Sequence, residues 1–229
     1  MDINTAIESR HSVRQYTEEL ISAETRALLE QEVDSCNSRG NLHMKLVWDE
    51  PEAFDSAMAH YGKFSGVRNY LVIAGSPAPD LDERGGYWGE HVALRAQELG
   101  LSTCWVAMTF KRRYVRAHLK KGDQMVLVVA LGHGATKGVV HKNKAASDVS
   151  NASATSPEWF THGVQYALLA PTAMNQQSFL ITLTGGTDAK GLPTVRIENK
   201  GGAYSKVDLG IVRYHFEVGA GESSFSWAK

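Results

Sequence analysis

Cysteine is scarce in this chain, and its scarcity limits the chemistry that side chains alone could perform. Cys36 and Cys104 are the only cysteines among 229 residues. Two cysteines this far apart in the sequence cannot form a zinc site with four thiolates or a CxxC redox pair. Redox chemistry in this protein therefore requires a cofactor.

An excess of one charge and long apolar runs are also missing. The chain has 24 Lys and Arg against 25 Asp and Glu, so no overall field favours nucleic acid or an anionic membrane, and any phosphate must be bound locally. The longest apolar run, from Val126 to Leu131, is too short to cross a bilayer. The N-terminal residues lack the apolar core of a signal peptide. We therefore expect a cytoplasmic protein with reduced thiols.

The sequence does contain clear helix and strand patterns. The expected helices cover residues 3–9, 23–40, 88–99, 157–168 and 207–218, and the expected strands cover 44–48, 70–74, 103–108, 125–131, 179–184 and 194–198. Residues 44–48 alternate like a half-buried strand, whereas the unbroken apolar run 125–131 indicates a central strand with both faces covered. Gly185-Gly186 indicates a turn, residues 134–156 a connector without apolar periodicity, and residues 221–229 a tail without assigned structure.

Two parts of the chain resemble each other. Residues 38–47 and 172–181 each combine the end of a helix, a loop, an asparagine and a strand, and a later helix pair matches through Glu98-Leu99-Gly100 and Glu217-Val218-Gly219. Any two helix–loop–strand units look alike to this extent, but the shared order of segments favours duplication. We therefore expect two related half-modules, residues 1–150 and a shorter one at residues 151–229.

A cluster of hydrogen-bond donors follows the first helix, where Arg10, His11, Ser12 and Arg14 lie within five residues. Guanidinium groups make short, charge-assisted bonds to anionic oxygens, so this cluster suits a phosphate-bearing ligand. Taken alone the signal is weak, because basic side chains at a helix C-terminus also compensate the helix dipole.

The stretch from Arg10 to Tyr16 resembles the opening flavin motif of the nitroreductase family, a basic-basic-Ser-x-basic-x-aromatic pattern. Other segments resemble further parts of the family in the same order along the chain. Residues 100–105 are similar to the segment that leads to the flavin N5 edge. Residues 131–134, with Lys142 and Lys144, are similar to the closing strand and a basic phosphate-binding pair. Residues 170–179 are similar to the family's Ala-Pro-Ser-x-x-Asn-x-Gln-Pro-Trp loop. Together these motifs cover most of the chain.

This resemblance implies an α+β sandwich with a central, mainly antiparallel sheet and a bound FMN. It implies that Arg10, His11 and Ser12 hold the phosphate, ribityl chain and pyrimidine edge. Arg14 is expected near N1 and O2, where a cation favours the reduced flavin. The remaining implied contacts are the backbone of Ala107 and Met108 at N5, Lys142 and Lys144 at the phosphate, and Pro171, Thr172 and Asn175 from the other half. No catalytic side chain is expected, because the flavin ring carries the chemistry.

One departure from the family is informative. In ordinary members the Pro-Ser-x-x-Asn loop follows the N-terminal motif closely and reaches into the flavin site of a partner subunit. Here the early copy at residues 37–41 lacks the proline, and the well-formed copy lies at residues 170–175. The simplest explanation is a pseudo-dimer in which residues 157–229 act as the partner, so that a monomer or weak homodimer holds a complete flavin site.

The resemblance further implies electron transfer from NAD(P)H through FMN to a nitroaromatic compound, a quinone or a similar small acceptor. Two alternatives stay open: a flavin-binding or storage protein without turnover, and another chemistry on the same scaffold, such as flavin fragmentation or reductive dehalogenation. No metal site is expected, and neither is a dinucleotide fingerprint. His60, Glu90 and His91 fall in no metal-ligand spacing, Cys104 is interpreted as a buried small hydrophobe, and Gly85-Gly86 lacks the GxGxxG pattern.

Overall fold

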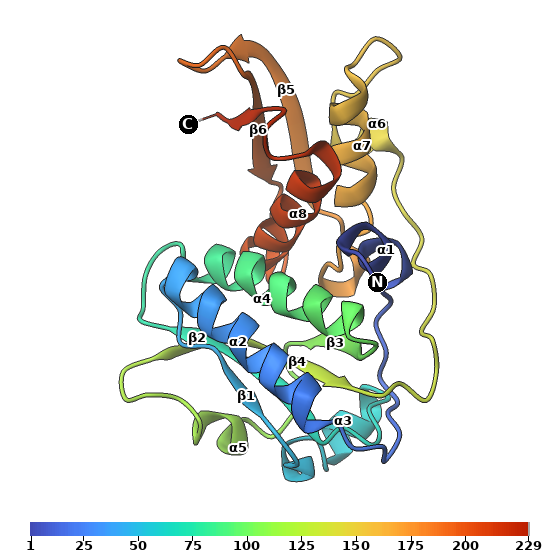
Figure 1. The fold of residues 1–229 in the computed structure, drawn as a ribbon, viewed down its shortest axis with the longest axis vertical. Coiled ribbons are helices and arrows are strands. Elements are labelled where there is room, and N and C mark those ends of the chain that lie inside the picture. Colours follow the sequence, from blue (N-terminus) through green and yellow to red (C-terminus); the bar gives the residue numbers. More distant parts are fainter. Residues whose placement is uncertain (229) are drawn as a thin grey trace.

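The protein folds into two lobes, each built around its own β-sheet (Figure 1). The computed structural model describes residues 1–228 without the side chains of Met58 and His60, so the sequence-based statement on His60 lies outside the described residues. The elements of the first lobe and the connector are α1 (Ile3–Ser9), α2 (Ala23–Gly40), β1 (Lys45–Val47), a 3₁₀ turn (Pro51–Ala53), α3 (Ala57–Tyr61), β2 (Asn69–Gly75), α4 (Leu81–Glu98), β3 (Ser102–Val106), α5 (Arg112–Arg116), β4 (Gln124–Gly132) and α6 (Ala146–Val149). Those of the second lobe are α7 (Glu158–Ala167), a 3₁₀ turn (Ala173–Asn175), β5 (Phe179–Thr187), β6 (Pro193–Asn199), α8 (Ser205–Ala220) and β7 (Ser226–Trp227). None of the helices in the described chain combines the length and the apolar composition that crossing a bilayer requires.

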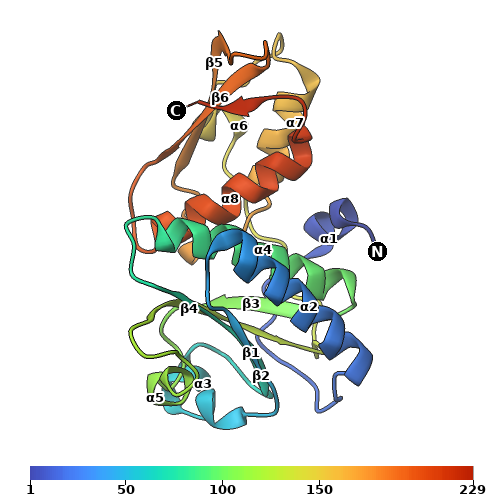
Figure 2. The ribbon, with the colours of Figure 1, turned by 60° about the vertical axis from the view of Figure 1, so that its left-hand side comes forward.

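The first sheet is antiparallel and has the strand order β1-β2-β4-β3. Its central strand β4 buries both faces, as the unbroken apolar run predicts: Val128 and Ala130 belong to the core on one side, and Val129 and Leu131 to the core on the other. α2 and α4 cover the second of these faces, and α3 and α5 lie at the first (Figure 2). The predicted α+β class with an antiparallel sheet is confirmed.

Two expectations for residues 1–150 need correction. β1 is not half-buried, because Leu46 and Val47 belong to the cores on opposite faces of the sheet and both are buried. The connector at residues 134–156 is not wholly irregular, since it contains α6, whose Val149 is fully buried in the core of the second lobe. One apolar residue in a polar stretch produces no periodicity, so the sequence pattern could not indicate this helix.

The second sheet has the order β5-β6-β7 and packs against α7 and α8. Gly185-Gly186 does not form the predicted turn: β5 continues through both glycines to Thr187, and the pairing with β6 is irregular there, as at a β-bulge. The chain reverses at residues 188–192 instead, where the Asp188 carboxylate accepts hydrogen bonds from backbone N–H groups. The tail is also structured, because Ser226–Trp227 pairs in parallel with β6 next to the buried Phe225.

α4 and α8 cross where the two lobes meet, and glycine makes the crossing close (Figures 1 and 2). A Cβ atom on Gly86 of α4 would overlap the carbonyl oxygen of Val207 in α8. A Cβ atom on Gly210 of α8 would overlap the carbonyl oxygen of Glu83 in α4. Gly86 thus faces Val207, which lies three residues before Gly210, and Gly210 faces Glu83, which lies three residues before Gly86. The contacts at the crossing are therefore reciprocal, as across a two-fold axis.

Replacing Gly210 with alanine is expected to destabilise the protein, because the new methyl group would meet backbone atoms of Glu83 and Tyr87 that cannot rotate away. Overpacking of this kind costs about 1–3 kcal/mol, which outweighs the gain of up to about 1 kcal/mol from the better helix propensity of alanine. Urea unfolding measures the difference. Gly186→Ala is the control, since a Cβ there finds its nearest neighbour at 3.5 Å; equal stability of the Gly210→Ala variant and the parent protein would show that the helices do not need this close approach.

Candidate functional site

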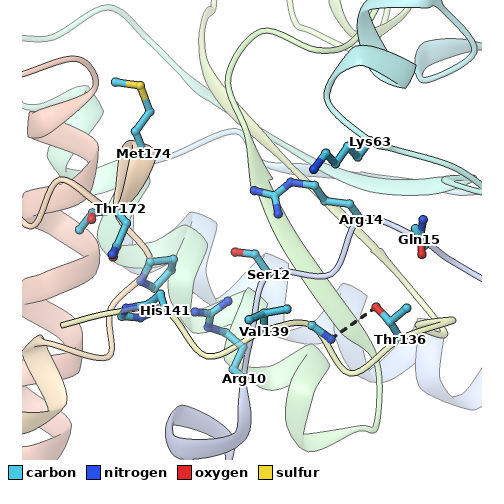
Figure 3. A pocket seen from close by; sticks show the side chains of 13 residues that line it. Arg10, Ser12, Arg14, Gln15, Lys63, Thr136, Val139, His141, Thr172 and Met174 are labelled. Carbon is cyan, nitrogen blue, oxygen red and sulfur yellow. Dashed lines mark hydrogen bonds between the residues drawn. The ribbon is translucent and has the colours of Figure 1, made fainter.

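Two adjoining cavities lie between the lobes, one of about 480 Å³ and one of about 240 Å³. Both are lined by Ser12, Arg14, Pro171, Thr172 and Met174. The larger cavity is the more polar of the two and also receives basic side chains from the chain after α1, the loop after α3 and the connector (Figure 3). The smaller cavity is more apolar and is bounded by residues 105–108 at the end of β3 and by the start of α8. Segments from both lobes thus form one continuous site.

Residues 10–16 leave α1 in an extended conformation along the edge of the first sheet. The Val13 N–H donates to the Thr103 carbonyl at 3.0 Å, and the Tyr16 hydroxyl donates to the Val13 carbonyl at 2.7 Å. Successive side chains of an extended segment point to opposite sides, so Val13 enters the core while Ser12 and Arg14 face the larger cavity (Figure 3). The alternation in the motif therefore has a direct structural cause.

Arg10 reaches the larger cavity although it is only 3% exposed. Its Nε lies 3.7 Å from Glu90 Oε1, and within the described chain neither its Nε nor its Nη1 has a hydrogen-bond partner. Glu90 is fully buried and also accepts a hydrogen bond from Trp105 Nε1 at 2.7 Å. A buried guanidinium with free donors is costly unless a ligand satisfies them. An anion in the larger cavity would satisfy free donors of Arg10.

His215 of α8 connects the second lobe to this arginine. Its Nδ1 lies 3.2 Å from the carbonyl oxygen of Tyr166, which can only accept a hydrogen bond, so Nδ1 carries a hydrogen. Its Nε2 lies 2.9 Å from Glu90 Oε1, and a second hydrogen must lie between these two atoms because otherwise two lone pairs would face each other. The buried Glu90–His215 pair thus joins α4 and α8 next to Arg10.

The loop after α7 closes the site from the second lobe. Its Met174, Asn175 and Gln177 have φ angles of 52°, 55° and 43°, a left-handed conformation that is costly for residues other than glycine. Hydrogen bonds hold this conformation: Asn175 Nδ2 donates to the Lys142 carbonyl at 2.7 Å, and the Gln177 N–H donates to Thr172 Oγ1 at 3.1 Å. This network keeps Thr172 and Met174 at the wall of both cavities.

Asp208, in the first turn of α8, anchors the same loop. Its carboxylate accepts hydrogen bonds from the Ala173 N–H at 3.0 Å and from Gln176 Nε2 at 2.6 Å. Burial raises the pKa of Asp208 to about 6, although these two hydrogen bonds act in the opposite direction. The smaller cavity therefore contains a carboxyl group that gains or loses a proton near neutral pH.

The raised pKa of Asp208 predicts a pH dependence of stability. The folded protein keeps this proton up to about pH 6, whereas the unfolded chain releases it near 3.8, the ordinary pKa of an aspartate. The stability contribution of Asp208 is therefore largest at low pH and falls as the pH rises between these values. Relative to Asp208→Asn, which does not titrate, the free energy of unfolding should fall by on the order of 3 kcal/mol from about pH 4 to about pH 7. Urea titrations of both proteins across this range test the prediction. A difference that stays constant with pH would contradict it.

The structure brings most of the predicted site residues together. Those that line one or both cavities are Arg10, Ser12, Arg14, Ala107, Met108, Pro171, Thr172 and Asn175. The other three line neither cavity. His11 lies against Gly138, Lys142 offers its carbonyl oxygen to the strained loop, and Lys144 Nζ donates to the Gln177 carbonyl at 3.0 Å. Lys142 contacts the loop through its backbone and Lys144 through its side chain, so the role of both lysines at the phosphate stays a prediction.

Three side chains at the site were missed by the sequence patterns. Lys63 and His141 line the larger cavity, and Asp208 lines the smaller one. Lys63 stands in a loop between glycines, and His141 in a connector without periodicity, so only their basic character hinted at a role. Asp208 gave no signal, because an acidic residue in the first turn of a helix is ordinary.

Comparison with known proteins identifies the fold. The family described as "Putative TM nitroreductase" matches residues 2–220. A nitroreductase structure from Thermotoga maritima has a TM-score of 0.66 at 22% identity and covers 97% of this chain and 85% of its own. A nitroreductase from Desulfovibrio desulfuricans, solved in complex with FMN, has a TM-score of 0.51 at 16% identity, covering 65% of this chain and 95% of its own. An NADH dehydrogenase/NAD(P)H nitroreductase from Bacteroides thetaiotaomicron has a TM-score of 0.52 at 21% identity, covering 64% and 95%. No curated protein matches the sequence.

Proposed function

Because this chain belongs to the nitroreductase family, we propose that it is an FMN-dependent oxidoreductase that takes electrons from NAD(P)H and passes them to a small acceptor, such as a nitroaromatic compound or a quinone. The observation that carries the proposal is the shape and polarity of the paired cavities. A cavity lined by a buried arginine with free hydrogen-bond donors adjoins a smaller and more apolar one. FMN has an anionic phosphate tail, which suits the larger cavity, and a flat aromatic ring, which suits the smaller and more apolar one.

The residues present fit FMN at its anionic end. Arg10 Nε, Arg10 Nη1 and His141 Nδ1 are buried nitrogen atoms that lack hydrogen-bond partners in the described part of the chain, and both residues line the larger cavity. Lys63 and Arg14 add two further cationic side chains to its wall (Figure 3). Phosphate oxygens would accept hydrogen bonds from Arg10, and from His141 Nδ1 when the imidazole carries both hydrogens, because His141 Nε2 faces the carbonyl oxygen of Leu169 at 3.5 Å. Charge-assisted bonds of this kind are stronger than neutral ones.

Each part of the site has a distinct task in this proposal. FMN, when bound, supplies the redox chemistry, because its ring accepts and releases electrons. Arg10, His141 and Lys63 bind the phosphate, while Ser12 and Arg14, which border both cavities, contact the part of the cofactor that passes from one to the other. The end of β3 and the loop at residues 171–174 enclose the ring and limit the access of water. Asp208 holds that loop in place when ionised.

We also propose that the chain contains both halves of the site, residues 1–150 forming one module and residues 151–229 acting as the partner subunit. The reciprocal glycine contacts at the α4–α8 crossing support this idea. So do two side-chain pairs around the same point. Glu90 of α4 pairs with His215 of α8, and at the corresponding positions the His91 ring of α4 stacks on Tyr214 of α8, with 3.6 Å between ring centroids. A local two-fold relation of this kind is what a fused dimer would retain.

An absorption spectrum of the purified protein tests the proposed function. The expected result is an oxidised flavin spectrum that NAD(P)H bleaches and that an added quinone or nitroaromatic compound restores. A bound flavin that NAD(P)H does not reduce would favour the storage protein over the enzyme. If neither the isolated protein nor protein incubated with FMN retains flavin after gel filtration, the proposed function is wrong.

A further inference from the structure

A second group of chemically active side chains lies away from the cavities, between α2 and α4. It consists of Glu32 and Cys36, one turn apart on α2, and His91 on α4. One ligand atom from each residue lies within 4.8 Å of the other two. The Cys36 Sγ is buried and donates to Glu32 Oε1 at 3.3 Å. The fold thus brings together a thiol, a carboxylate and an imidazole.

His91 is the unusual member of this group. Its ring is stacked between Trp88, at 4.8 Å between centroids, and Tyr214, at 3.6 Å. Its Nε2 is buried and has no hydrogen-bond partner among the described residues. The comparison with His215 is instructive, because both ring nitrogens of His215 have partners. A buried nitrogen without a hydrogen-bond partner destabilises the folded protein, and a ligand at His91 Nε2 would remove this cost.

We propose that Glu32, Cys36 and His91 form a binding site for a divalent transition metal of the zinc type, with a fourth position open to water. Sulfur, nitrogen and one carboxylate oxygen are the donors that zinc prefers, whereas magnesium and calcium prefer oxygen alone. Donor atoms around tetrahedral zinc lie about 3.5 Å apart, as follows from metal–ligand distances of about 2.0–2.3 Å. Side-chain movements of about an ångström would close the site.

The charges balance when the metal binds. The bond between the Cys36 sulfur and its hydrogen breaks, a sulfur–metal bond forms, and the proton leaves through Glu32 or directly to solvent. Two positive charges on the metal then meet one thiolate and one carboxylate, so the cluster is neutral. This neutrality matters because the Arg39 guanidinium lies nearby, stacked over Trp88 at 4.5 Å from the ring centroid. A cluster with net positive charge would be repelled by Arg39.

The location of the site defines what the metal does. Glu32 and Cys36 belong to α2, while His91 belongs to α4 and packs on Tyr214 of α8. A metal at this point therefore fastens α2 to α4 and braces the crossing of α4 with α8. The sequence spacing could not show this site, because the ligands come from two helices; the only local signal was a glutamate four residues before a cysteine on one helix.

Cobalt(II) binding to the full-length chain, stripped of metal and flavin, tests the proposal. Flavin is removed because it absorbs in the same spectral region. We expect a thiolate-to-cobalt charge-transfer band and the intense visible bands of tetrahedral cobalt. Cys36→Ala should abolish the charge-transfer band, whereas Cys104→Ala, which removes the other buried thiol, should keep it. Glu32→Gln and His91→Phe should each lower cobalt affinity by at least about tenfold; His91→Phe keeps a ring between Trp88 and Tyr214.

Thermal unfolding gives an independent measurement. Zinc should raise the unfolding midpoint of the parent chain and of Cys104→Ala, and at the same zinc concentration it should raise that of Glu32→Gln or His91→Phe by less. If Cys36→Ala does not fold, the last two variants carry the test. The proposal is overturned if saturating cobalt produces no charge-transfer band in the parent chain, if the band survives in Cys36→Ala, or if Glu32→Gln and His91→Phe bind cobalt as the parent does.

Discussion

Replacing Arg10 with alanine is expected to weaken FMN binding by about tenfold to a hundredfold and to leave riboflavin binding nearly unchanged. A hydrogen bond to a charged group contributes about 1.5–3 kcal/mol, and riboflavin lacks the phosphate that Arg10 would contact. The fold should survive, because Glu90 keeps its contacts with Trp105 and His215 when Arg10 is removed. Quenching of flavin fluorescence measures both affinities.

The ratio of the two affinities is the decisive quantity. A purely structural role for Arg10 would weaken FMN and riboflavin equally, and this outcome would contradict the assignment of the larger cavity to the phosphate. Arg26→Ala is the matched control. Arg26 forms an ion pair with Asp49 at 2.8 Å and lines neither cavity, so its loss should change neither affinity. Flavin bound by the parent protein with no preference for FMN over riboflavin would exclude an anion site at Arg10.

Removal of the second lobe is expected to abolish flavin binding. A chain that ends near Asn151 lacks the loop with Thr172 and Met174, which borders both cavities, and it lacks Asp208. It also deprives the buried Glu90 of His215 and exposes apolar surface around Trp105 and Leu127, which contribute to the core of the second lobe. An exposed patch of this kind promotes association. Size-exclusion chromatography with light scattering should therefore show a flavin-free aggregate or dimer.

Two comparisons make this prediction specific. The full-length chain should bind one FMN as a monomer, because its second lobe already occupies the place of a partner. Co-expression of residues 1–151 with residues 152–229 should restore flavin binding if the lobes fold and associate. The single-chain proposal fails if the shortened chain holds stoichiometric FMN, or if the full-length protein loses flavin on dilution in step with the dissociation of a dimer; the assignment of FMN would stand in either case.

The sequence alone was sufficient for features that depend on neighbouring residues. Asp2 and Ser22 each accept the backbone N–H three residues later, as helix-capping patterns predict. The run from Met125 to Leu131 is an inner strand of the first sheet, because only a strand covered on both faces can bury consecutive side chains such as those from Leu127 to Leu131. The extended segment after α1 presents Ser12 and Arg14 to the cavity, and most of the predicted site residues line one of the two cavities. In each case the pattern that carries the prediction lies in a few neighbouring residues.

Local patterns failed where a long-range partner decides the outcome. Gly185-Gly186 has the composition of a turn, but pairing with β6 extends β5 through both residues. The tail after Gly221 has no periodicity, yet Trp227 pairs with β6 because the neighbouring Phe225 is buried in the apolar core of the second lobe.

The sequence by itself determined the class of fold, the family and the part of the site formed by residues 10–16. Helix caps, alternating side chains and short motifs depend only on residues that are adjacent in the chain. Only the tertiary structure decided which side chains complete the site. Glu90 and His215 are 125 residues apart, and their contact exists because Gly86 and Gly210 allow α4 and α8 to approach closely. The packing of α2 on α4 places His91 near Cys36, and the start of α8 sets Asp208 beneath the loop of the second lobe. Such contacts depend on how whole helices pack, and packing follows from the shape of many side chains together rather than from any spacing along the chain.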